Sequence, residues 1–331
     1  MAGPARPRRR RGLMAVVVVG AGIAGTACAA ELAAAGVPVR LVERAGGVGG
    51  RMGGHVVAGR PVDLGAAYFT VRDPGFEQVV RRWEAAGLAR PWTSELAVLS
   101  GGTRDRAPGP QRWAAPGGLG GLVAELAAGL TVELGREVRR VGPGPIVDGE
   151  PADAVVLAMP DPQALRLLEP GHPAAARLTG RGWRPAIAVA AGWAVREWAE
   201  LPAAFVNDHP VLTLIADDGR RRGDGAPVLV AHTTAAVARA HEADPDGAIG
   251  PVLDALRELL GVRSAPAWTL AHHWPHASPD GTRDEPFHLT ADGIGLAGDG
   301  WGSPRVETAW RSGHLLGTEL AEWVRRGRPA G

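Results

Sequence analysis

Three glycines near the amino terminus have the spacing of a dinucleotide-binding turn. The segment Gly-Ala-Gly-Ile-Ala-Gly directly follows four consecutive valines. In such a turn the first glycine permits the bend, the second lets backbone N–H groups approach a pyrophosphate, and the third lets helix and strand pack closely. The helix expected over 23–35 would direct its unpaired N–H groups and its dipole at that pyrophosphate. The cofactor-binding residues predicted here are Gly20, Gly22, Ile23, Ala24 and Gly25.

Charged residues follow the second expected strand, over 37–42. Glu43 lies 18 positions after Gly25, where a carboxylate accepts hydrogen bonds from a ribose diol and repels a 2′-phosphate. Arg51, in a glycine-rich run, is suited to bidentate contact with a phosphate. The Glu43 carboxylate therefore disfavours NADP as the bound nucleotide. The residues predicted to bind the cofactor in this region are Glu43, Arg44, Gly50, Arg51 and Met52.

A second segment near the carboxyl terminus favours FAD over NAD. An apolar strand expected over 294–297 ends in Gly298 and Asp299, whose carboxylate could accept from ribityl or ribose hydroxyls. A helix expected to begin near Val306 could point its free N–H groups at the pyrimidine end of a flavin, where negative charge develops on reduction. A simple helix cap is the alternative role for Asp299. The predicted contacts here are Gly298, Asp299, Arg305, Val306 and Glu307, with Val138 added from an expected strand over 138–141.

The composition excludes several other classes of function. Every one of the 36 basic residues is arginine, so no Schiff-base lysine, P-loop lysine or flavin-associated lysine of the amine oxidase type exists. Cys28 is the only cysteine, which excludes an internal disulfide and a CxxC pair. The net charge of the whole chain is +1, and beyond the first eleven residues the basic residues are scattered, so we expect no nucleic-acid partner. The histidines at 272, 273, 276 and 288 have no recognised ligand spacing, and we expect no metal.

The order of elements predicts an α/β protein with two domains. A Rossmann-type FAD-binding domain is expected from residues 14–70, 130–165 and 285–331, with a sheet-rich substrate domain inserted as residues 71–129 and 166–284. Further expectations are helices over 74–86 and 162–177 and a loop over 101–109. Residues 1–13 are expected to be a disordered basic tail. No run reaches the roughly 18 apolar residues of a membrane span, and we expect a cytoplasmic protein.

At this point the chain resembles the renalase-like FAD-dependent oxidoreductases, which are relatives of the flavin amine oxidases. The matching segments are 20–25, 49–52, 63–70, 115–119, 159–162, 232–234, 297–301 and 305–307. The family usually has glutamine where this chain has Ala67, so no polar side chain is expected at that position. The resemblance implies a fold like that of p-hydroxybenzoate hydroxylase and a noncovalent FAD. It also implies oxidation of 2- or 6-dihydro isomers of NAD(P)H, with electrons passing to O2.

Candidates for the substrate pocket are fewer and rest on weaker patterns. Trp301 follows Asp299 and could form a pocket wall, His232 could orient a substrate amide, and Tyr68 could add an aromatic surface. For Tyr68 core filling, and for His232 a purely structural role, is an equally good interpretation. Two alternative functions stay open: a flavin amine oxidase or desaturase, and a flavin-binding sensor without catalysis.

Overall fold

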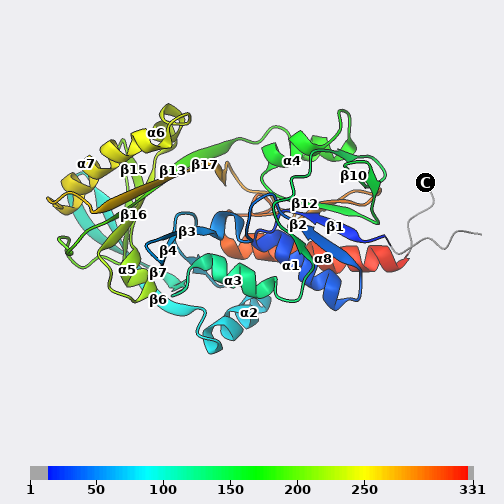
Figure 1. The fold of residues 1–331 in the computed structure, drawn as a ribbon, viewed down its shortest axis with the longest axis horizontal. Coiled ribbons are helices and arrows are strands. Elements are labelled where there is room, and N and C mark those ends of the chain that lie inside the picture. The colour runs from blue at the N-terminus through cyan, green and yellow to red at the C-terminus, as the bar shows by residue number, and fades with distance from the viewer. Residues whose placement is uncertain (1–13, 327–331) are drawn as a thin grey trace, which may run out of the picture.

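The computed structural model describes residues 14–326, so the tail expected over 1–13 lies outside the described residues. Two large sheets lie at opposite ends of an elongated molecule (Figure 1). The six-stranded sheet has the order β18-β19-β12-β1-β2-β8, and its five strands from β19 to β8 run parallel. These strands are β18 (His288–Leu289), β19 (Ile294–Ala297), β12 (Val155–Ala158), β1 (Val16–Val19), β2 (Val39–Val42) and β8 (Val132–Glu133). All four valines of β1 are buried, as expected for a central strand covered on both faces.

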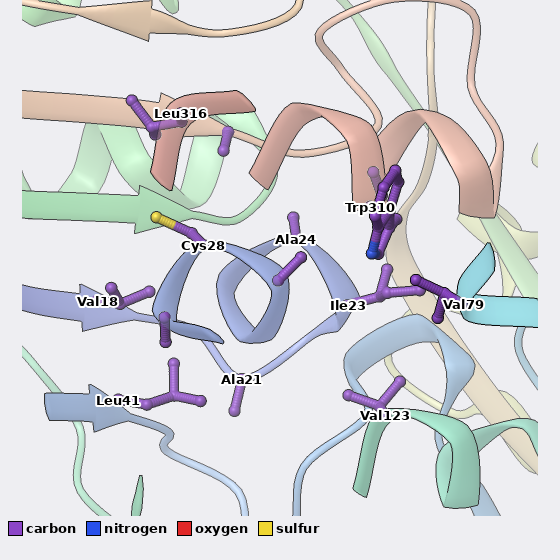
Figure 2. Packing of buried hydrophobic residues seen from close by; sticks show 14 of the residues in the cluster. Val18, Ala21, Ile23, Ala24, Cys28, Leu41, Val79, Val123, Trp310 and Leu316 are labelled. Carbon is purple, nitrogen blue, oxygen red and sulfur yellow. The ribbon is translucent and has the colours of Figure 1, made fainter. Parts of the chain in front are cut away.

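Helices cover one face of this sheet. Of these, α1 (Ile23–Ala34) and α8 (Val306–Arg326) pack directly on its strands, while α2 (Pro74–Ala85) packs against α8 and α3 (Leu119–Leu126) packs against α1. Figure 2 shows Ala24 and Cys28 of α1 directed at α8, with Val79 of α2 and Val123 of α3 nearby. The helices α2 and α3 therefore share the hydrophobic core of the nucleotide-binding sheet. The sequence predicts both within the substrate domain, whereas their apolar residues pack in this core.

Small elements cover the other face of the six-stranded sheet. They are β9 (Val141–Gly142), β10 (Ile146–Val147), β11 (Glu150–Pro151), α4 (Asp161–Leu167) and the 3-10 helix η2 (Pro173–Arg177). The helix expected over 162–177 is thus broken. Pro170 and Gly171, which has a φ of +79°, separate α4 from η2, and neither residue continues a helix well. The strand expected over 138–141 is also wrong, since pairing begins only at Val141.

The eight-stranded sheet forms the other end of the molecule. Its order is β17-β13-β16-β15-β14-β6-β7-β5. The strands are β17 (Trp268–Pro279), β13 (Trp183–Gly192), β16 (Val228–Thr233), β15 (Leu212–Asp217), β14 (Ala203–Val206), β6 (Arg90–Ser100), β7 (Thr103–Ala114) and β5 (Phe69–Thr70). The loop expected over 101–109 is wrong, because Gly101 and Gly102 make a tight turn and the polar residues after it pair with β6.

The two faces of the eight-stranded sheet have different coverings. The outer face packs against α6 (Ala235–Ala240), η3 (Pro245–Ala248) and α7 (Ile249–Leu260). The opposite face, here called the inner face, packs against residues 62–68 and the hairpin of β3 (Gly54–Val57) and β4 (Arg60–Asp63). Along each strand, residues with side chains on the inner face alternate with residues that face the outer side. They include Leu96, Ala188, Ala190, Ala203, Phe205, Leu214, Ala216, Val230, His232, Leu270, His272 and Trp274.

The remaining elements are η1 (Gly50–Met52) and α5 (Asp218–Arg222). Among residues 14–326, no helix has both the length and the apolar character needed to cross a membrane.

Candidate functional site

The carboxyl end of β1 meets the amino end of α1 in the turn predicted from the glycine spacing. Gly20 has a φ of +103°, and a Cβ there would lie 2.6 Å from the carbonyl oxygen of Ala158 on β12. A Cβ on Gly25 would lie 1.9 Å from the carbonyl oxygen of Gly20. No side chain caps α1 at Gly22. The N–H groups of the first turn are therefore open to an anion.

A second glycine loop lies against this turn. The N–H of Gly49 donates to the carbonyl oxygen of Ala21 at 2.9 Å. Gly50 has a φ of +54°, and a Cβ there would lie 3.2 Å from the Cα of Gly22. Side chains are thus excluded where the two loops meet, and an extended pyrophosphate could approach backbone on both sides.

Glu43 follows β2 at the same edge of the sheet. Its carboxylate accepts hydrogen bonds from the N–H groups of Ala21 and Ala45, each at 2.8 Å. One bond to each oxygen leaves further lone pairs on both. These could accept from a ribose diol, as the sequence predicts, while the protein N–H groups keep the carboxylate oriented.

Arg51 and Asp299, which are 248 positions apart, are brought into a bidentate ion pair. The guanidinium nitrogens of Arg51 lie 2.9 and 2.6 Å from the Asp299 carboxylate oxygens. Arg51 also lies 5.3 Å from the centre of the Trp183 ring. Both halves of the predicted cofactor site therefore converge at one place. Asp299 is not a helix cap here, because α8 begins seven residues later.

The helix predicted near Val306 begins at that residue. The hydrogen bonds of Glu307 and Gly298 limit how each could contact a flavin. The carboxylate of Glu307 accepts from the N–H groups of Arg72 and Asp73 at 2.5 and 2.7 Å, so its side chain anchors the segment before α2. Gly298 has a φ of +144°, and its N–H donates to Ser312 Oγ of α8 at 2.9 Å. Any flavin contact at Glu307 would thus use its backbone.

Trp301 is not a wall of a pocket, which corrects the sequence-based expectation. Its side chain is 3% exposed and packs in the core beneath the six-stranded sheet. Arg283 lies 4.3 Å from its ring centre, and His288 is parallel to it at 6.1 Å. The turn after Asp299 directs the indole into the nucleotide-binding domain and away from the inner face.

The other predicted cofactor residues differ in exposure. Ile23, Ala24, Met52 and Val138 are buried, whereas Arg44 and Arg305 are exposed. Val138 packs in the same cluster as Trp301, so a contact from it would come from its backbone.

Two arginines that sequence reasoning missed hold the turn after Asp299. Arg181 and Arg283 both donate to the carbonyl oxygen of Gly300, and Arg283 also pairs with Asp161 at 2.9 and 3.1 Å. Burial, with the charge of Arg283, lowers the pKa of Arg181. No spacing signal could have revealed this group, because its members come from three distant segments.

A positive environment also surrounds His276, near the edge of β17. Burial, together with the charges of Arg166 and Arg51, lowers the pKa of its imidazole. The backbone carbonyl oxygens of His276 and Ala277 lie 3.4 and 3.3 Å from Arg51. Arg44 adds a further positive charge here.

His232 and Tyr68 share the inner face of the eight-stranded sheet. His232 pairs in register with Ala188, and Ala188 pairs with His272. Burial, with the charge of Arg221, lowers the pKa of His232 to about 4, so its imidazole is neutral near pH 7. Tyr68 packs against inner-face residues, with its ring centre 6.3 Å from that of Trp92. Within the described residues, no three histidine, cysteine or acidic side chains gather as a metal site would require.

Comparisons with known proteins agree with this geometry. Residues 18–83 match the NAD(P)-binding Rossmann-like domain, and residues 86–316 match the flavin-containing amine oxidoreductase family. Hydroxyneurosporene desaturase from Rubrivivax gelatinosus is 50% identical over 72 residues, which is 22% of this chain. That alignment spans only 13% of the desaturase.

Solved structures share the fold at low sequence identity. A protein assigned as a protoporphyrinogen oxidase from Exiguobacterium sp. 255-15 has a TM-score of 0.76 at 15% identity, over 94% of this chain and 99% of its own. Cyclohexylamine oxidase from Brevibacterium oxydans IH-35A has a TM-score of 0.74 at 16% identity, over 95% of this chain and 100% of its own. Putrescine oxidase bound to putrescine has a TM-score of 0.69 at 16% identity, over 95% of this chain and 99% of its own.

FAD, the cofactor of this family, fits the residues present. The uncapped start of α1 and the glycine contact between residues 22 and 50 would hold its pyrophosphate. Glu43 would hold the adenosine ribose. Arg51 and Asp299 lie where the two nucleotide-binding segments meet.

Proposed function

Because the chain belongs to the flavin-containing amine oxidoreductase family, with FAD as its cofactor, we propose that it oxidises 2- and 6-dihydro isomers of NAD(P)H. Molecular oxygen is the proposed electron acceptor. The two domains are proposed to be arranged as in p-hydroxybenzoate hydroxylase, and the protein to act in the cytoplasm, where nicotinamide nucleotides carry electrons.

The observation that carries the proposal is the chemical character of the inner face. Its members are apolar residues and histidines, and none of those named above is acidic. The charge that acts on the pKa of His232 is the positive charge of Arg221. A protonated amine needs negative charge nearby, whereas a dihydronicotinamide ring needs a flat apolar surface and hydrogen-bond partners.

The arginines around His276 favour a phosphate-bearing substrate. Arg44, Arg51 and Arg166 all act on His276 at the edge of the inner face. Arginines are the side chains best suited to bind phosphate groups. Part of this positive charge serves the pyrophosphate of FAD, and exposed Arg166 is available to the phosphates of a dinucleotide substrate.

When bound, FAD supplies a hydride acceptor and passes two electrons on to O2. The protein's part is to align the donor carbon of the substrate, which needs no strong acid or base. Neutral His232 could donate to or accept from the substrate amide, and Tyr68 could bound the ring. The complete lack of lysine removes the residue that many amine oxidases carry near the flavin.

An anaerobic screen tests the proposal. The FAD-loaded protein is mixed with the 2- and 6-dihydro isomers, with ordinary 4-dihydro NADH and with a panel of primary amines and polyamines, while flavin bleaching is followed. We expect the two isomers to bleach the flavin far faster than any other compound. Rapid bleaching by an amine alone would replace the proposal with the second candidate below.

The second candidate is an amine oxidase or desaturase. It is favoured by the family match and by solved neighbours named as oxidases of cyclohexylamine and putrescine. A desaturase is favoured by the 72-residue match. A non-catalytic sensor would retain FAD that no substrate in the screen bleaches.

A further inference from the structure

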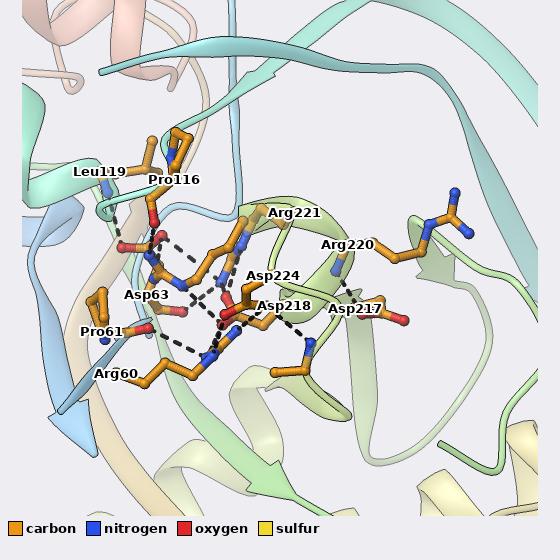
Figure 3. A network of polar contacts seen from close by, with 12 residues as sticks. Arg60, Pro61, Asp63, Pro116, Leu119, Asp217, Asp218, Arg220, Arg221 and Asp224 are labelled. Atoms are coloured by element: carbon orange, nitrogen blue, oxygen red, sulfur yellow. Dashed lines mark hydrogen bonds and ion pairs between the residues drawn. The ribbon is translucent and has the colours of Figure 1, made fainter. Parts of the chain in front are cut away.

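A largely buried network of six charges joins α5 to β4 and to the segment after it, beside the inner face. Asp218 and Arg221 of α5 are 0% and 1% exposed, and Asp63 at the end of β4 is 2% exposed. Figure 3 shows these side chains converging, with Arg60 and Asp224 at the open end of the group. Arg222 completes it through Asp218 and Asp63, each at 3.0 Å. Three arginines and three aspartates leave the network without net charge.

Arg221 uses its guanidinium differently from its neighbours. Two of its nitrogens bind the Asp218 carboxylate, one of them Nε at 3.0 Å. The other donors reach the backbone carbonyl oxygens of Ala67 at 3.0 Å and Asp63 at 3.2 Å. A planar fork can serve a carboxylate and two carbonyls at once, whereas a lysine ammonium cannot match that geometry. The side chain thus clamps both ends of the 63–67 segment.

Tyr68 follows directly after this clamp. Its ring packs against Leu96, Ala203 and Ala216 of the inner face and lies 5.3 Å from the Arg112 guanidinium. Holding the Ala67 carbonyl fixes the peptide plane from which Tyr68 departs. A shift of that plane would move the phenol ring across the inner face.

We propose that Arg221 is a positioning residue, which holds the backbone of Asp63 and Ala67 and thereby sets where Tyr68 lies on the inner face. The role of Tyr68 in hydride transfer rests on the function proposed above, but its placement by Arg221 does not. Arg222 serves as the matched control. It also pairs with the carboxylates of Asp218 and Asp63, but it donates to the carbonyl oxygen of Pro116 instead of that of Ala67.

The experiment uses the fact that Tyr68 is the only tyrosine in the chain. Protein labelled with 3-fluorotyrosine gives one 19F resonance, which reports the surroundings of this ring alone. Spectra are compared for the wild type, Arg221→Lys, Arg222→Lys and Arg220→Lys, each with FAD bound. Arg220 is next to Arg221 but points away from the network (Figure 3). Its side chain pairs with Glu200 at the surface.

We expect Arg221→Lys to shift, split or broaden the resonance, because the ring then samples several positions. Arg222→Lys should lower the melting temperature as a buried change does, yet leave the resonance at its wild-type position. Arg220→Lys should change neither. If Arg221→Lys and Arg222→Lys leave the resonance equally unaltered, or alter it equally, Arg221 has no special hold on Tyr68 and the proposal is wrong.

A charge-balanced double variant covers the case in which Arg221→Lys does not fold. Asp218→Asn with Arg221→Met removes one charge of each sign and keeps most of the volume, a change that buried ion pairs often tolerate. It should disturb the Tyr68 resonance in the same way. A single unshifted resonance in this variant would overturn the proposal.

Kinetics add a test of coupling. The rate constant of anaerobic flavin reduction by the 6-dihydro isomer should fall about tenfold or more in Arg221→Lys, since small misplacements cost at least this much. In a Tyr68→Ala background the same change should cost about twofold or less, because the two residues act as a unit. Equal losses in both backgrounds would contradict action through Tyr68. If the isomer bleaches no variant while the 19F result holds, the function is wrong and the positioning stands.

Discussion

Gly313 of α8 lies where that helix crosses the first turn of α1, and replacing it with alanine tests how the cofactor site is supported. A Cβ there would lie 1.8 Å from the carbonyl oxygen of Ala24, whereas ordinary contact begins near 3.4 Å. The obstacle is backbone, so the two helices must separate by more than 1 Å. Overpacking of this kind costs about 3 kcal/mol, offset by about 1 kcal/mol of improved helix propensity, which leaves a net loss of about 2 kcal/mol.

The same displacement should weaken FAD binding. Ala24 belongs to the turn whose N–H groups are expected to hold the pyrophosphate, and lengthening one such charge-assisted bond costs about tenfold in affinity. The melting temperature of the apoprotein and the Kd for FAD, from quenching of its fluorescence, measure the two effects. We expect Gly313→Ala to lower the melting temperature by several degrees and raise the Kd about tenfold.

Two other glycines provide controls for this reasoning. A Cβ on Gly317 would lie 2.7 Å from the carbonyl oxygen of Cys28, one turn further from the pyrophosphate, so Gly317→Ala should cost stability with less effect on FAD. Gly121 of α3 is exposed with nothing within 4 Å of a Cβ, and Gly121→Ala should be neutral or stabilising. Wild-type stability and affinity in Gly313→Ala would refute this account of the α1–α8 contact.

Three further predictions concern single side chains. Glu43→Ala and Arg51→Ala should each weaken FAD retention by about tenfold or more, because each removes charge-assisted hydrogen bonds; unchanged Kd values in both would show that the nucleotide lies elsewhere. Cys28 is fully buried, which raises the pKa of its thiol, so a thiol reagent such as DTNB should react only after unfolding, and stoichiometric reaction with the native protein would contradict its burial. The hydrogen bond to Glu31, 3.0 Å away, raises the pKa of His314, so this pair stabilises the fold below pH 6.5 and loses that effect as the pH rises through the folded-state pKa. The melting-temperature deficit of His314→Gln should therefore be larger at pH 6 than at pH 8.5, and the reverse order would contradict the pair.

The elements with strong local patterns could be predicted from the sequence. Helix α1 ends within one residue of the end expected from the glycine turn, and α2 forms within the range expected for it, with Phe76, Val79, Val80 and Trp83 buried. These cases succeed because spacing alone encodes the turn and the buried face. The first nine residues of β7 are almost all exposed and give no alternating pattern, and their pairing depends on the turn at Gly101 and Gly102, so local sequence does not predict this strand.

The candidate site could be predicted only where the position of a residue after a strand determines where its side chain lies. Glu43 binds the glycine turn and Arg51 pairs with Asp299, since each follows a strand of one sheet or the loop beside it, while their contacts with FAD stay predictions. Trp301 was misplaced because adjacency in sequence does not give the direction of a side chain after a turn. The clamp by Arg221 depends on contacts between segments about 150 residues apart, which no local pattern reveals.

The most direct test of the proposed function is the stoichiometry of a complete turnover with O2. The FAD-loaded protein is given a limiting amount of 6-dihydro NADH, and the oxidised nucleotide and hydrogen peroxide are quantified together. Hydride transfer to the flavin followed by reoxidation predicts one NAD+ and one H2O2 for each isomer consumed, with 4-dihydro NADH left unconsumed over the same period. If the isomer is not consumed while a primary amine or polyamine yields peroxide and the matching aldehyde or ketone, the dihydronicotinamide reading is contradicted.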